Sequence, residues 1–211
     1  ASPPNWCWCG WRRSGRCDRV IVALVMAAGA ARRFGTQKLV YPVRGEPLVR
    51  VAVDRVVAAG PEQTIVVVGH DSDAVRRALA GLPVTIVENP YPEQGLSSSL
   101  RAGLAMVPSN AVAVLVTLGD QPIDRDEVLP ALVARFGGDD APIVAPRYQG
   151  VQGLPVLSAR SVFPELERLS GDRGARSVVE RDPSRVAYVD FDFPMPPDID
   201  TPADLKTLTD S

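Results

Sequence analysis

Val20-Ile-Val-Ala-Leu-Val-Met-Ala-Ala-Gly29 is the stretch that decides the fold, and Ala30-Ala-Arg-Arg-Phe-Gly-Thr-Gln-Lys38 follows it directly. An apolar run of β-forming residues that ends in small residues predicts a buried strand leading into a tight turn. Small side chains let backbone N–H groups come close to a ligand, and Arg32, Arg33 and Lys38 add positive charge beside them. Because such backbone donors bind phosphate groups, the stretch predicts a site for a nucleoside triphosphate.

Two other interpretations of this stretch stay open on the residues alone. The arginines between Arg12 and Arg19, followed by the apolar run, resemble a secretory signal, and Arg12-Arg13 resembles a twin-arginine pair. Cleavage after Ala28 or Ala31 would remove the strand that precedes a regular β/α pattern, and the run is shorter than the about 20 residues of a membrane span. Arg32, Arg33 and Lys38 could also be ordinary surface charges, but this interpretation does not explain their position directly after the turn.

The composition of the chain predicts a soluble protein with one domain. Its 211 residues suffice for one sizeable core, and 45% hydrophobic with 23% charged residues is typical of globular proteins. The 23 Lys and Arg residues are balanced by 25 Asp and Glu residues, so no overall positive field attracts nucleic acid. We therefore expect a cytoplasmic protein with small-molecule substrates and with neither nucleic acid nor a membrane as its partner.

The first 19 residues differ in composition from the rest of the chain. They contain every cysteine and every tryptophan of the protein, namely Cys7, Cys9, Cys17, Trp6, Trp8 and Trp11. No disulfide framework can therefore span the fold, and three cysteines lack the fourth ligand of a structural zinc site. We predict that residues 1–19 are a disordered or non-native extension and that residues 20–211 form the functional domain.

Downstream of Val20 the sequence alternates between expected strands and helices. The expected strands are Val20–Met26, Thr64–Val68, Val84–Glu88, Val112–Leu118, Ile143–Ala145 and Val186–Val189. The expected helices are Pro47–Ala59, Ser72–Ala80, Ser98–Met106, Arg125–Phe136, Ser161–Leu169, Ala175–Glu180 and Pro202–Leu208. Strands that are apolar at every position, as around Val66 and Val114, indicate a parallel sheet covered on both faces. The order predicts a single-domain, doubly wound, Rossmann-like α/β fold with a mostly parallel sheet, whose ligands bind beyond the carboxyl ends of the strands.

Two acidic positions predict a metal site at that edge of the sheet. Asp120 ends a wholly apolar strand, where a lone carboxylate is costly unless it is paired, caps the next helix or binds a metal. Asp200 belongs to an acidic cluster in which it or Thr201 could cap a helix that begins at Pro202. Mg²⁺ often takes one or two carboxylates together with phosphate oxygens. Asp120 and Asp200 would supply this pair if the fold brings them together.

Glycine lies beside polar side chains in three further loops, Gly95–Arg101, Gln152–Pro155 and Gly171–Arg176. In the first loop Ser97 or Ser98 is a natural N-cap, and the three adjacent hydroxyls also suit a polar ligand. The other two loops are either ordinary turns or parts of a binding site, and helix capping is the simplest role of Asp172 and Arg176. His70 has no Ser/His/Asp arrangement around it in the sequence, so we assign it no catalytic role.

Six segments, in order, resemble the MobA-like class of nucleotidyltransferases. The loop Ala27-Ala28-Gly29-(x3)-Arg33-Phe34-Gly35-(x2)-Lys38-Leu39 is similar to the signature loop of that class. Gly119-Asp120-Gln121-Pro122 resembles its metal-binding strand end, and Asp200-Thr201-Pro202-Ala203-Asp204 resembles its carboxy-terminal acidic motif. The segments Gly95–Gly103, Leu118–Pro122 and Gly171–Arg176 are similar to one branch, the MocA-type molybdenum cofactor cytidylyltransferases. The resemblance covers residues 20–208 and implies the fold of nucleotide-diphospho-sugar transferases.

The resemblance implies a Mg²⁺-dependent transfer of the CMP part of CTP to the terminal phosphate of molybdopterin, with release of pyrophosphate. Lys38, Arg33 and Asp120 would be catalytic, since alignment and charge neutralisation are sufficient for a phosphate nucleophile. Asp120 and Asp200 would bind Mg²⁺. The nucleotide would be bound by Ala27, Ala28, Gly29, Arg33, Lys38, Ser97, Ser98 and Gly119. The acceptor would be bound by Gly153, Pro155 and Asp172.

The chain departs from the family pattern at Ala31, where glycine or serine is usual, and at Leu154, where histidine is frequent. One alternative is therefore a guanylyltransferase or another NTP transferase that acts on a different phosphorylated acceptor. A second alternative is a non-catalytic carrier that hands molybdenum cofactor to an apo-enzyme, with an acceptor molybdoenzyme as its protein partner.

Overall fold

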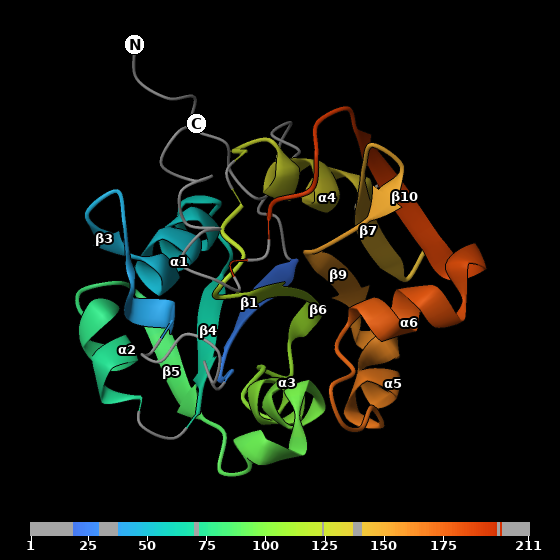
Figure 1. Ribbon diagram of the computed structural model, residues 1–211. Coiled ribbons are helices and arrows are strands. Elements are labelled where there is room, and N and C mark those ends of the chain that lie inside the picture. The colour runs from blue at the N-terminus through green and yellow to red at the C-terminus, as the bar shows by residue number, and fades with distance from the viewer. Residues whose placement is uncertain are drawn as a thin grey trace.

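The computed structural model describes residues 19–29, 38–69, 72–123, 125–136, 141–197 and 199. Within them a sheet of eight strands runs through the centre of the molecule (Figure 1). Its order is β10-β7-β9-β6-β1-β4-β5, and β8 pairs with β7 outside this path. The strands of this sheet are β1 (Val20–Ala27), β4 (Gln63–Val68), β5 (Val84–Glu88), β6 (Ala111–Leu118), β7 (Ile143–Tyr148), β8 (Val151–Gln152), β9 (Val156–Ala159) and β10 (Val186–Phe191).

Helices cover both faces of this sheet (Figure 1). The α-helices in the described part of the chain are α1 (Leu48–Ala58), α2 (Asp73–Ala78), α3 (Leu96–Leu104), α4 (Val128–Phe136), α5 (Phe163–Glu167) and α6 (Arg176–Arg181). Short 3-10 helices are η1 (Lys38–Val40), η2 (Pro92–Gln94), η3 (Arg160–Val162) and η4 (Pro183–Arg185). A small hairpin of β2 (Pro42–Val43) and β3 (Glu46–Pro47) precedes α1.

Alternating side chains of β1 divide the core into two layers. Val25 and Ala27 belong to the layer that contains residues of α1, α2 and α4. Val22 and Leu24 belong to the layer that contains residues of α3, α5 and α6. Both faces of β1 are buried, as its wholly apolar sequence predicted, because helices lie over each of them. The predicted single-domain α/β fold is therefore confirmed.

Strand pairing in the eight-stranded sheet is parallel except at β8, which is antiparallel to β7, and at β9. β1 pairs in parallel with β4 and β6, β4 with β5, and β7 with β10. β9 is antiparallel to both β6 and β7, and the sequence analysis did not expect it. Its four residues follow a glycine and a proline, so the segment resembles a loop when only local sequence is considered. Pairing with two long neighbours makes it a strand, because those neighbours satisfy its backbone hydrogen bonds.

Several expected elements have different bounds in the structure. β7 and β10 each continue beyond the expected end because they pair with one another as far as Tyr148 and Phe191. The expected helix Ser161–Leu169 is divided into η3 and α5, with a proline in the first turn of α5 that lacks an N–H donor. The expected helix Pro202–Leu208 lies outside the described residues.

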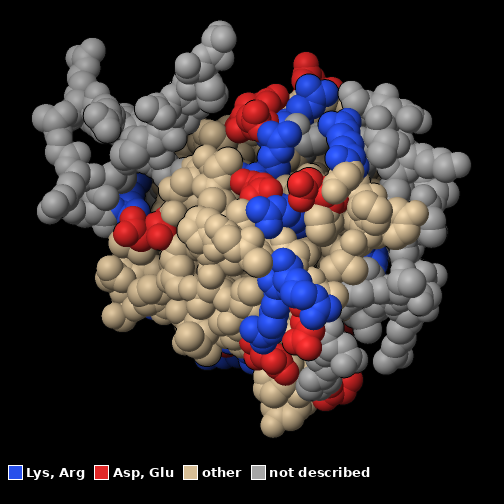
Figure 2. Space-filling view, turned by 90° about the vertical axis from the view of Figure 1, so that its left-hand side faces the viewer, with Lys and Arg blue, Asp and Glu red and all other residues tan. Residues whose placement is uncertain are grey.

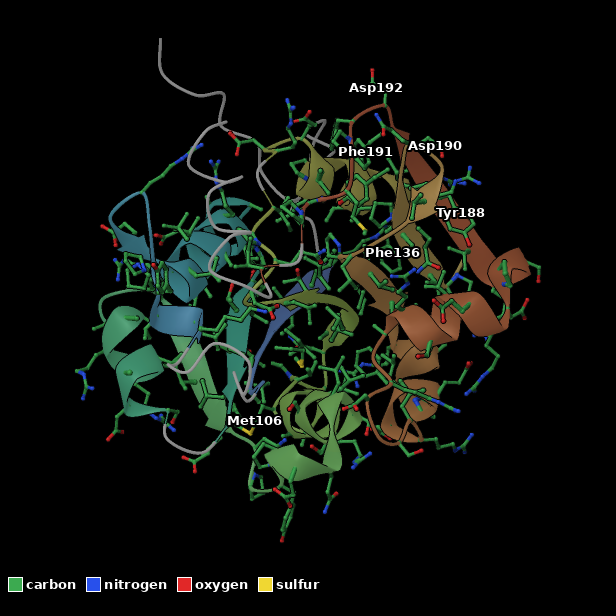
Figure 3. All side chains as sticks on the ribbon, in the orientation of Figure 1. Met106, Phe136, Tyr188, Asp190, Phe191 and Asp192 are labelled. Carbon is green, nitrogen blue, oxygen red and sulfur yellow. The ribbon has the colours of Figure 1, made fainter. Side chains whose placement is uncertain are left out.

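Aromatic and ionic contacts close the β10 edge of the sheet (Figure 3). Phe191 stacks on Tyr148 with ring centroids 5.6 Å apart, and its ring centroid lies 5.1 Å from that of Phe193. Arg147 donates hydrogen bonds to both carboxylate oxygens of Asp190, at 2.7 and 2.9 Å. This hydrogen bonding is the main cause that lowers the pKa of the Asp190 carboxyl. Arg147 on β7 and Asp190 on β10 lie three and four strands from β1 along the sheet, so the pair is separate from the carboxyl end of β1.

Charged side chains of opposite sign are mixed on the surface. On the face shown in Figure 2, Lys and Arg side chains lie beside Asp and Glu side chains. Ion pairs also form within α1 and its approach, where Arg50 lies 3.6 Å from a carboxylate oxygen of Glu46 and 3.8 Å from one of Asp54. The overall balance of charge in the sequence is therefore also found locally on this face. No helix among the described residues combines the length and the apolar character needed to cross a membrane.

Candidate nucleotide and metal site

The turns that follow β1, β4 and β6 meet at the carboxyl edge of the sheet. The Gly119 amide donates to the Met26 carbonyl oxygen at 2.9 Å, which joins the ends of β6 and β1. A Cβ at Gly69, after β4, would lie only 3.0 Å from the Ala28 carbonyl oxygen. Gly29 is exposed, and a Cβ there would meet no described atom within 4 Å. The backbone after β1 is therefore open to a ligand at the point where three strand ends converge.

Asp120 follows β6 and forms an ion pair with Lys38. Lys38 Nζ and Asp120 Oδ2 are 2.9 Å apart, and the two side chains are 11% and 33% exposed. Lys38 begins η1, which is anchored by Leu39 in the core and by a hydrogen bond from the Tyr41 amide to the Lys38 carbonyl oxygen. The expected phosphate-binding cation and the expected metal ligand therefore lie together, although they are distant in sequence.

Other residues expected at this edge lie partly outside the described residues. Arg33, Asp200 and His70 belong to the segments that the structure does not describe. Ile199, the neighbour of Asp200, is fully buried against side chains of β2 and α1. Asp120 does not cap the next helix, because α4 begins well after it. Within the described residues no group of three or more His, Cys, Asp or Glu side chains is arranged to hold a metal ion.

The serines at the start of α3 are not N-caps, contrary to the sequence-based expectation. α3 begins before them, and Gly95 occupies the N-cap position with a φ of 87° and no side-chain cap. Ser98 Oγ lies 2.8 Å from the carbonyl oxygens of both Gly95 and Tyr91 and donates there. Ser97 Oγ is buried and has no hydrogen-bond partner among the described residues. A buried hydroxyl of this kind is uncommon in folded proteins, and Ser97, at 0% exposure, offers no surface to a ligand in this structure.

Asn89 connects the end of β5 to the start of α3. Its Nδ2 donates to Ser98 Oγ at 2.8 Å and to Ser99 Oγ at 3.0 Å, and its Oδ1 accepts from the Tyr91 amide at 2.9 Å. Asn89 is 1% exposed, so these contacts replace water for most of its polar atoms. The amide therefore fixes the serine-bearing turn relative to the sheet.

Asn89→Ala is expected to lower the free energy of unfolding by about 2–3 kcal/mol, because it leaves buried hydroxyl and amide groups without their partner. Chemical denaturation followed by circular dichroism measures this change. Gln63→Ala is a matched control, since it also removes an amide that bonds to a hydroxyl, here Thr85 Oγ1 at 3.2 Å. Equal losses in the two variants would show that the Asn89 contacts are no more important than those of a peripheral amide.

The loop that begins at Gly171 packs directly on the start of α3. The Gly171 carbonyl oxygen accepts from the Ser97 amide at 3.0 Å. A Cβ at Gly95 would lie 2.5 Å from the Gly171 carbonyl carbon and 2.6 Å from Asp172 Oδ1. Asp172 does not cap α6, contrary to the simplest expectation, since α6 begins at Arg176 without a side-chain cap. This loop instead positions the serine-bearing turn.

A cavity of about 240 Å³ extends from this loop to the carboxyl ends of β1 and β6. Its apolar lining includes Met26, Leu118, Leu154 and Met195, and its polar lining includes Gln121, Asp172, Arg176 and Glu180. Of the three expected acceptor residues, Gly153 and Asp172 line this cavity. Pro155 is buried and is not among the lining residues. The structure thus brings together two of the three residues expected on the acceptor side.

Sequence reasoning gave no role to two residues that organise the site. Gln121 is 7% exposed, and its Nε2 donates to the Pro196 carbonyl oxygen at 2.9 Å. This bond ties the segment after β10 to the turn that carries Asp120. Asn89 directly follows β5. Because ligand sites form beyond the carboxyl ends of parallel strands, its position could have indicated a role at the site. Nothing local to Gln121 indicates its distant carbonyl partner.

Comparison with known proteins indicates the family. A family model described as the MobA-like NTP transferase domain matches residues 23–186. A curated relative, the bifunctional protein GlmU of Halorhodospira halophila, is 35% identical over 132 residues, which are 63% of this chain and 27% of GlmU. The chain thus spans about a quarter of the length of the curated relatives it matches.

Solved structures resemble the chain over nearly its whole length. The crystal structure of Rv0371c from Mycobacterium tuberculosis is 33% identical, with a TM-score of 0.82, and covers 92% of this chain and 98% of that chain. A structure of Rv0371c in complex with manganese is 30% identical, with a TM-score of 0.77, and covers 92% of this chain and 99% of that chain. The similarity supports the same single-domain architecture.

Proposed function

The chain belongs to the family of MobA-like NTP transferase domains, and from this premise we propose that it transfers the CMP part of CTP to the terminal phosphate of molybdopterin. Membership of the family supports a nucleotidyl transfer to a small molecule. The choice of CTP and of molybdopterin rests on the similarity of three segments to the MocA-type branch, namely Gly95–Gly103, Leu118–Pro122 and Gly171–Arg176. An acceptor molybdoenzyme would then be the protein that receives the product.

The observation that carries this proposal is the position of Lys38 and Asp120. A cation and a carboxylate lie 2.9 Å apart beyond the strand ends, at the edge where the Gly29 backbone is exposed. Nucleotidyl transfer needs positive charge for the triphosphate, a carboxylate for a divalent cation and open backbone donors. The same edge supplies all three.

A divalent cation fits the residues at this edge when phosphate oxygens complete its coordination. Asp120 is a partly exposed carboxylate at a strand end, and Mg²⁺ often binds one or two carboxylates together with substrate phosphates. Asp120 and Asp200 would hold the ion, and the manganese complex of Rv0371c supports a metal in this fold. When bound, the ion would neutralise charge on the triphosphate.

The protein residues would act mainly by alignment and by charge. An oxygen of the acceptor phosphate forms a bond to the α-phosphorus of CTP, while the bond from that phosphorus to the bridging oxygen breaks and pyrophosphate leaves. Lys38 and Arg33 would stabilise the negative charge that develops on the departing pyrophosphate. The exposed backbone at Gly29 would orient the phosphates. A phosphate nucleophile is already ionised, so no general base is required.

The cavity beside the site suits the body of an acceptor. Its lining combines apolar side chains such as Met26 and Leu154 with the polar groups of Asp172 and Arg176. A flat heterocycle can bury its faces against the apolar walls while its edge groups bond to the polar side chains. This supports a pterin as the acceptor. Another phosphorylated acceptor is the second candidate, since membership of the family does not distinguish between acceptors.

Purified protein is expected to release pyrophosphate from CTP, but not from GTP, ATP or UTP, when Mg²⁺ and molybdenum cofactor are present. CTP with Mg²⁺ is also expected to raise the melting temperature by several degrees, because a ligand that binds only the native state stabilises it. A coupled pyrophosphate assay and differential scanning fluorimetry measure the two effects.

Pyrophosphate release with GTP in place of CTP would show that the protein is a guanylyltransferase. Release that requires a phosphorylated sugar instead of molybdenum cofactor would show a different acceptor with the same nucleotidyl transfer. If no nucleotide releases pyrophosphate with any phosphorylated acceptor, nucleotidyl transfer is wrong for this chain and the carrier alternative remains.

A further inference from the structure

We propose that Lys38 couples cation binding at Asp120 to the nucleotide, so that the site binds a divalent cation more tightly with a triphosphate than alone. The inference rests on the nucleotidyl transfer proposed above, and it begins with one contact. Lys38 Nζ lies 2.9 Å from Asp120 Oδ2. An ammonium at hydrogen-bonding distance occupies one of the two carboxylate oxygens that could bind a cation. Lys38 therefore acts on the metal ligand as well as on phosphate.

A free divalent cation at Asp120 Oδ1 would lie beside the Lys38 ammonium, and one at Oδ2 would have to displace it. Both groups are positive, and two like charges a few ångströms apart near a protein surface repel by several times the thermal energy. Lys38 is only 9% exposed, so water cannot fully replace the carboxylate contact after displacement. Binding of the cation alone is therefore opposed both by repulsion and by loss of the ion pair.

A cation that arrives with a triphosphate meets a different balance of charge. The phosphate oxygens of the nucleotide are negatively charged, so the Lys38 ammonium can bind to them when it leaves Asp120. The released carboxylate then binds the cation, whose remaining ligands include the same phosphate group. The nucleotide thus removes both penalties that oppose the free cation. Cation and nucleotide binding at this site are consequently coupled through Lys38.

The residue type at this position fits the exchange. Lys38 and Lys206 are the only lysines in the chain, and the rest of its 23 Lys and Arg residues are arginines. An arginine would hold the carboxylate through two parallel hydrogen bonds, as Arg147 holds Asp190 at 2.7 and 2.9 Å. The lysine ammonium is a point charge on a flexible stem, so it can pass from a carboxylate oxygen to a phosphate oxygen.

Titration of the full chain with Mn²⁺ tests the proposal without turnover. Electron paramagnetic resonance of free Mn²⁺ gives the dissociation constant in the absence of nucleotide. Lys38→Met keeps the length and the apolar stem and removes the charge, so Mn²⁺ alone should bind at least about tenfold more tightly than in the wild type. In the presence of CTP the order should reverse, because the variant lacks the cation that binds phosphate.

Two control variants identify the carboxylate that is responsible. The gain in Mn²⁺ affinity should disappear when Asp120→Asn is added to Lys38→Met. Arg147→Met also frees a carboxylate, but Asp190 is 66% exposed and water screens its charge, so this variant should produce little gain. Because melting curves report folding independently, a variant that unfolds is recognised before its titration is interpreted.

Equal Mn²⁺ affinities of the wild type and Lys38→Met without nucleotide would overturn the proposal, and so would a gain that persists after Asp120→Asn. These results leave the proposed function intact if the wild type still releases pyrophosphate from CTP. The converse result, in which the wild type releases no pyrophosphate but the titrations follow the expected order, would remove the function and keep the coupling between cation and nucleotide.

Discussion

Asp120→Asn is expected to lower the rate of pyrophosphate release at least about a hundredfold while the protein stays folded. The asparagine keeps the shape of the side chain, and its carbonyl oxygen can still accept a hydrogen bond from Lys38 Nζ, which lies 2.9 Å from Asp120 Oδ2. It loses the negative charge that would hold a divalent cation against the triphosphate. Steady-state kinetics with CTP measure the loss in kcat/KM.

Asp190→Asn is the matched control for this substitution. Asp190 is also a carboxylate in an ion pair, with Arg147 Nε at 2.7 Å, but it is exposed and lies at the β10 edge of the sheet. Activity should stay at the wild-type level in Asp190→Asn, and both variants should melt within a few degrees of the wild type. Unchanged activity of Asp120→Asn, in the assay and in cells, would show that metal-assisted transfer is not what the protein does.

The parallel core could be predicted because its signal is local. Each residue of a strand buried on both faces must be apolar, and the seven residues after Val20 in β1 are all buried in one or the other layer. The same rule places ligands beyond the carboxyl ends of such strands. The sequence alone therefore predicted that Gly29 and Asp120 lie at one edge of the sheet. A carboxylate after an apolar strand was expected to need a partner, and Asp120 has one in Lys38.

The start of α3 could not be predicted from local sequence. Serine is a favoured N-cap, and Ser97 and Ser98 follow a glycine, so helix initiation at the serines was the expected result. In the structure the helix begins earlier, because Asn89 binds the Ser98 hydroxyl and Gly171 accepts the Ser97 amide. The second of these contacts joins residues far apart in the sequence, and no rule about caps contains it.

β9 and the cavity depend on the same kind of distant contact. Val156–Ala159 becomes a strand only because β6 and β7 lie on either side of it. Gln121 reaches Pro196, and that bond holds the segment that carries Met195 beside the cavity. The acceptor side of the site was therefore less predictable than the phosphate side, since its walls come from loops whose partners are set by tertiary packing.

Gly95→Ala is expected to cost about 3–5 kcal/mol of stability, which would lower the melting temperature by about 10 °C or more. Gly95 has a φ of 87° and a ψ of −176°, a conformation that is essentially restricted to glycine. A Cβ would in addition lie 2.5 Å from the Gly171 carbonyl carbon and 2.6 Å from Asp172 Oδ1. Backbone atoms cannot move aside as a flexible side chain can, so the two loops must separate.

Two glycine variants divide this cost into its causes. Gly81 has a similar φ of 85°, but a Cβ there would meet no described atom within 4 Å, so Gly81→Ala should cost only about 1–2 kcal/mol from backbone strain. At Gly174 a Cβ would meet the Leu96 side chain at 2.6 Å, and that side chain can rotate away. Denaturation curves should therefore rank Gly95→Ala as the most costly of the three. If Gly95→Ala costs no more than Gly81→Ala, the close packing of the Gly171 loop against α3 is wrong.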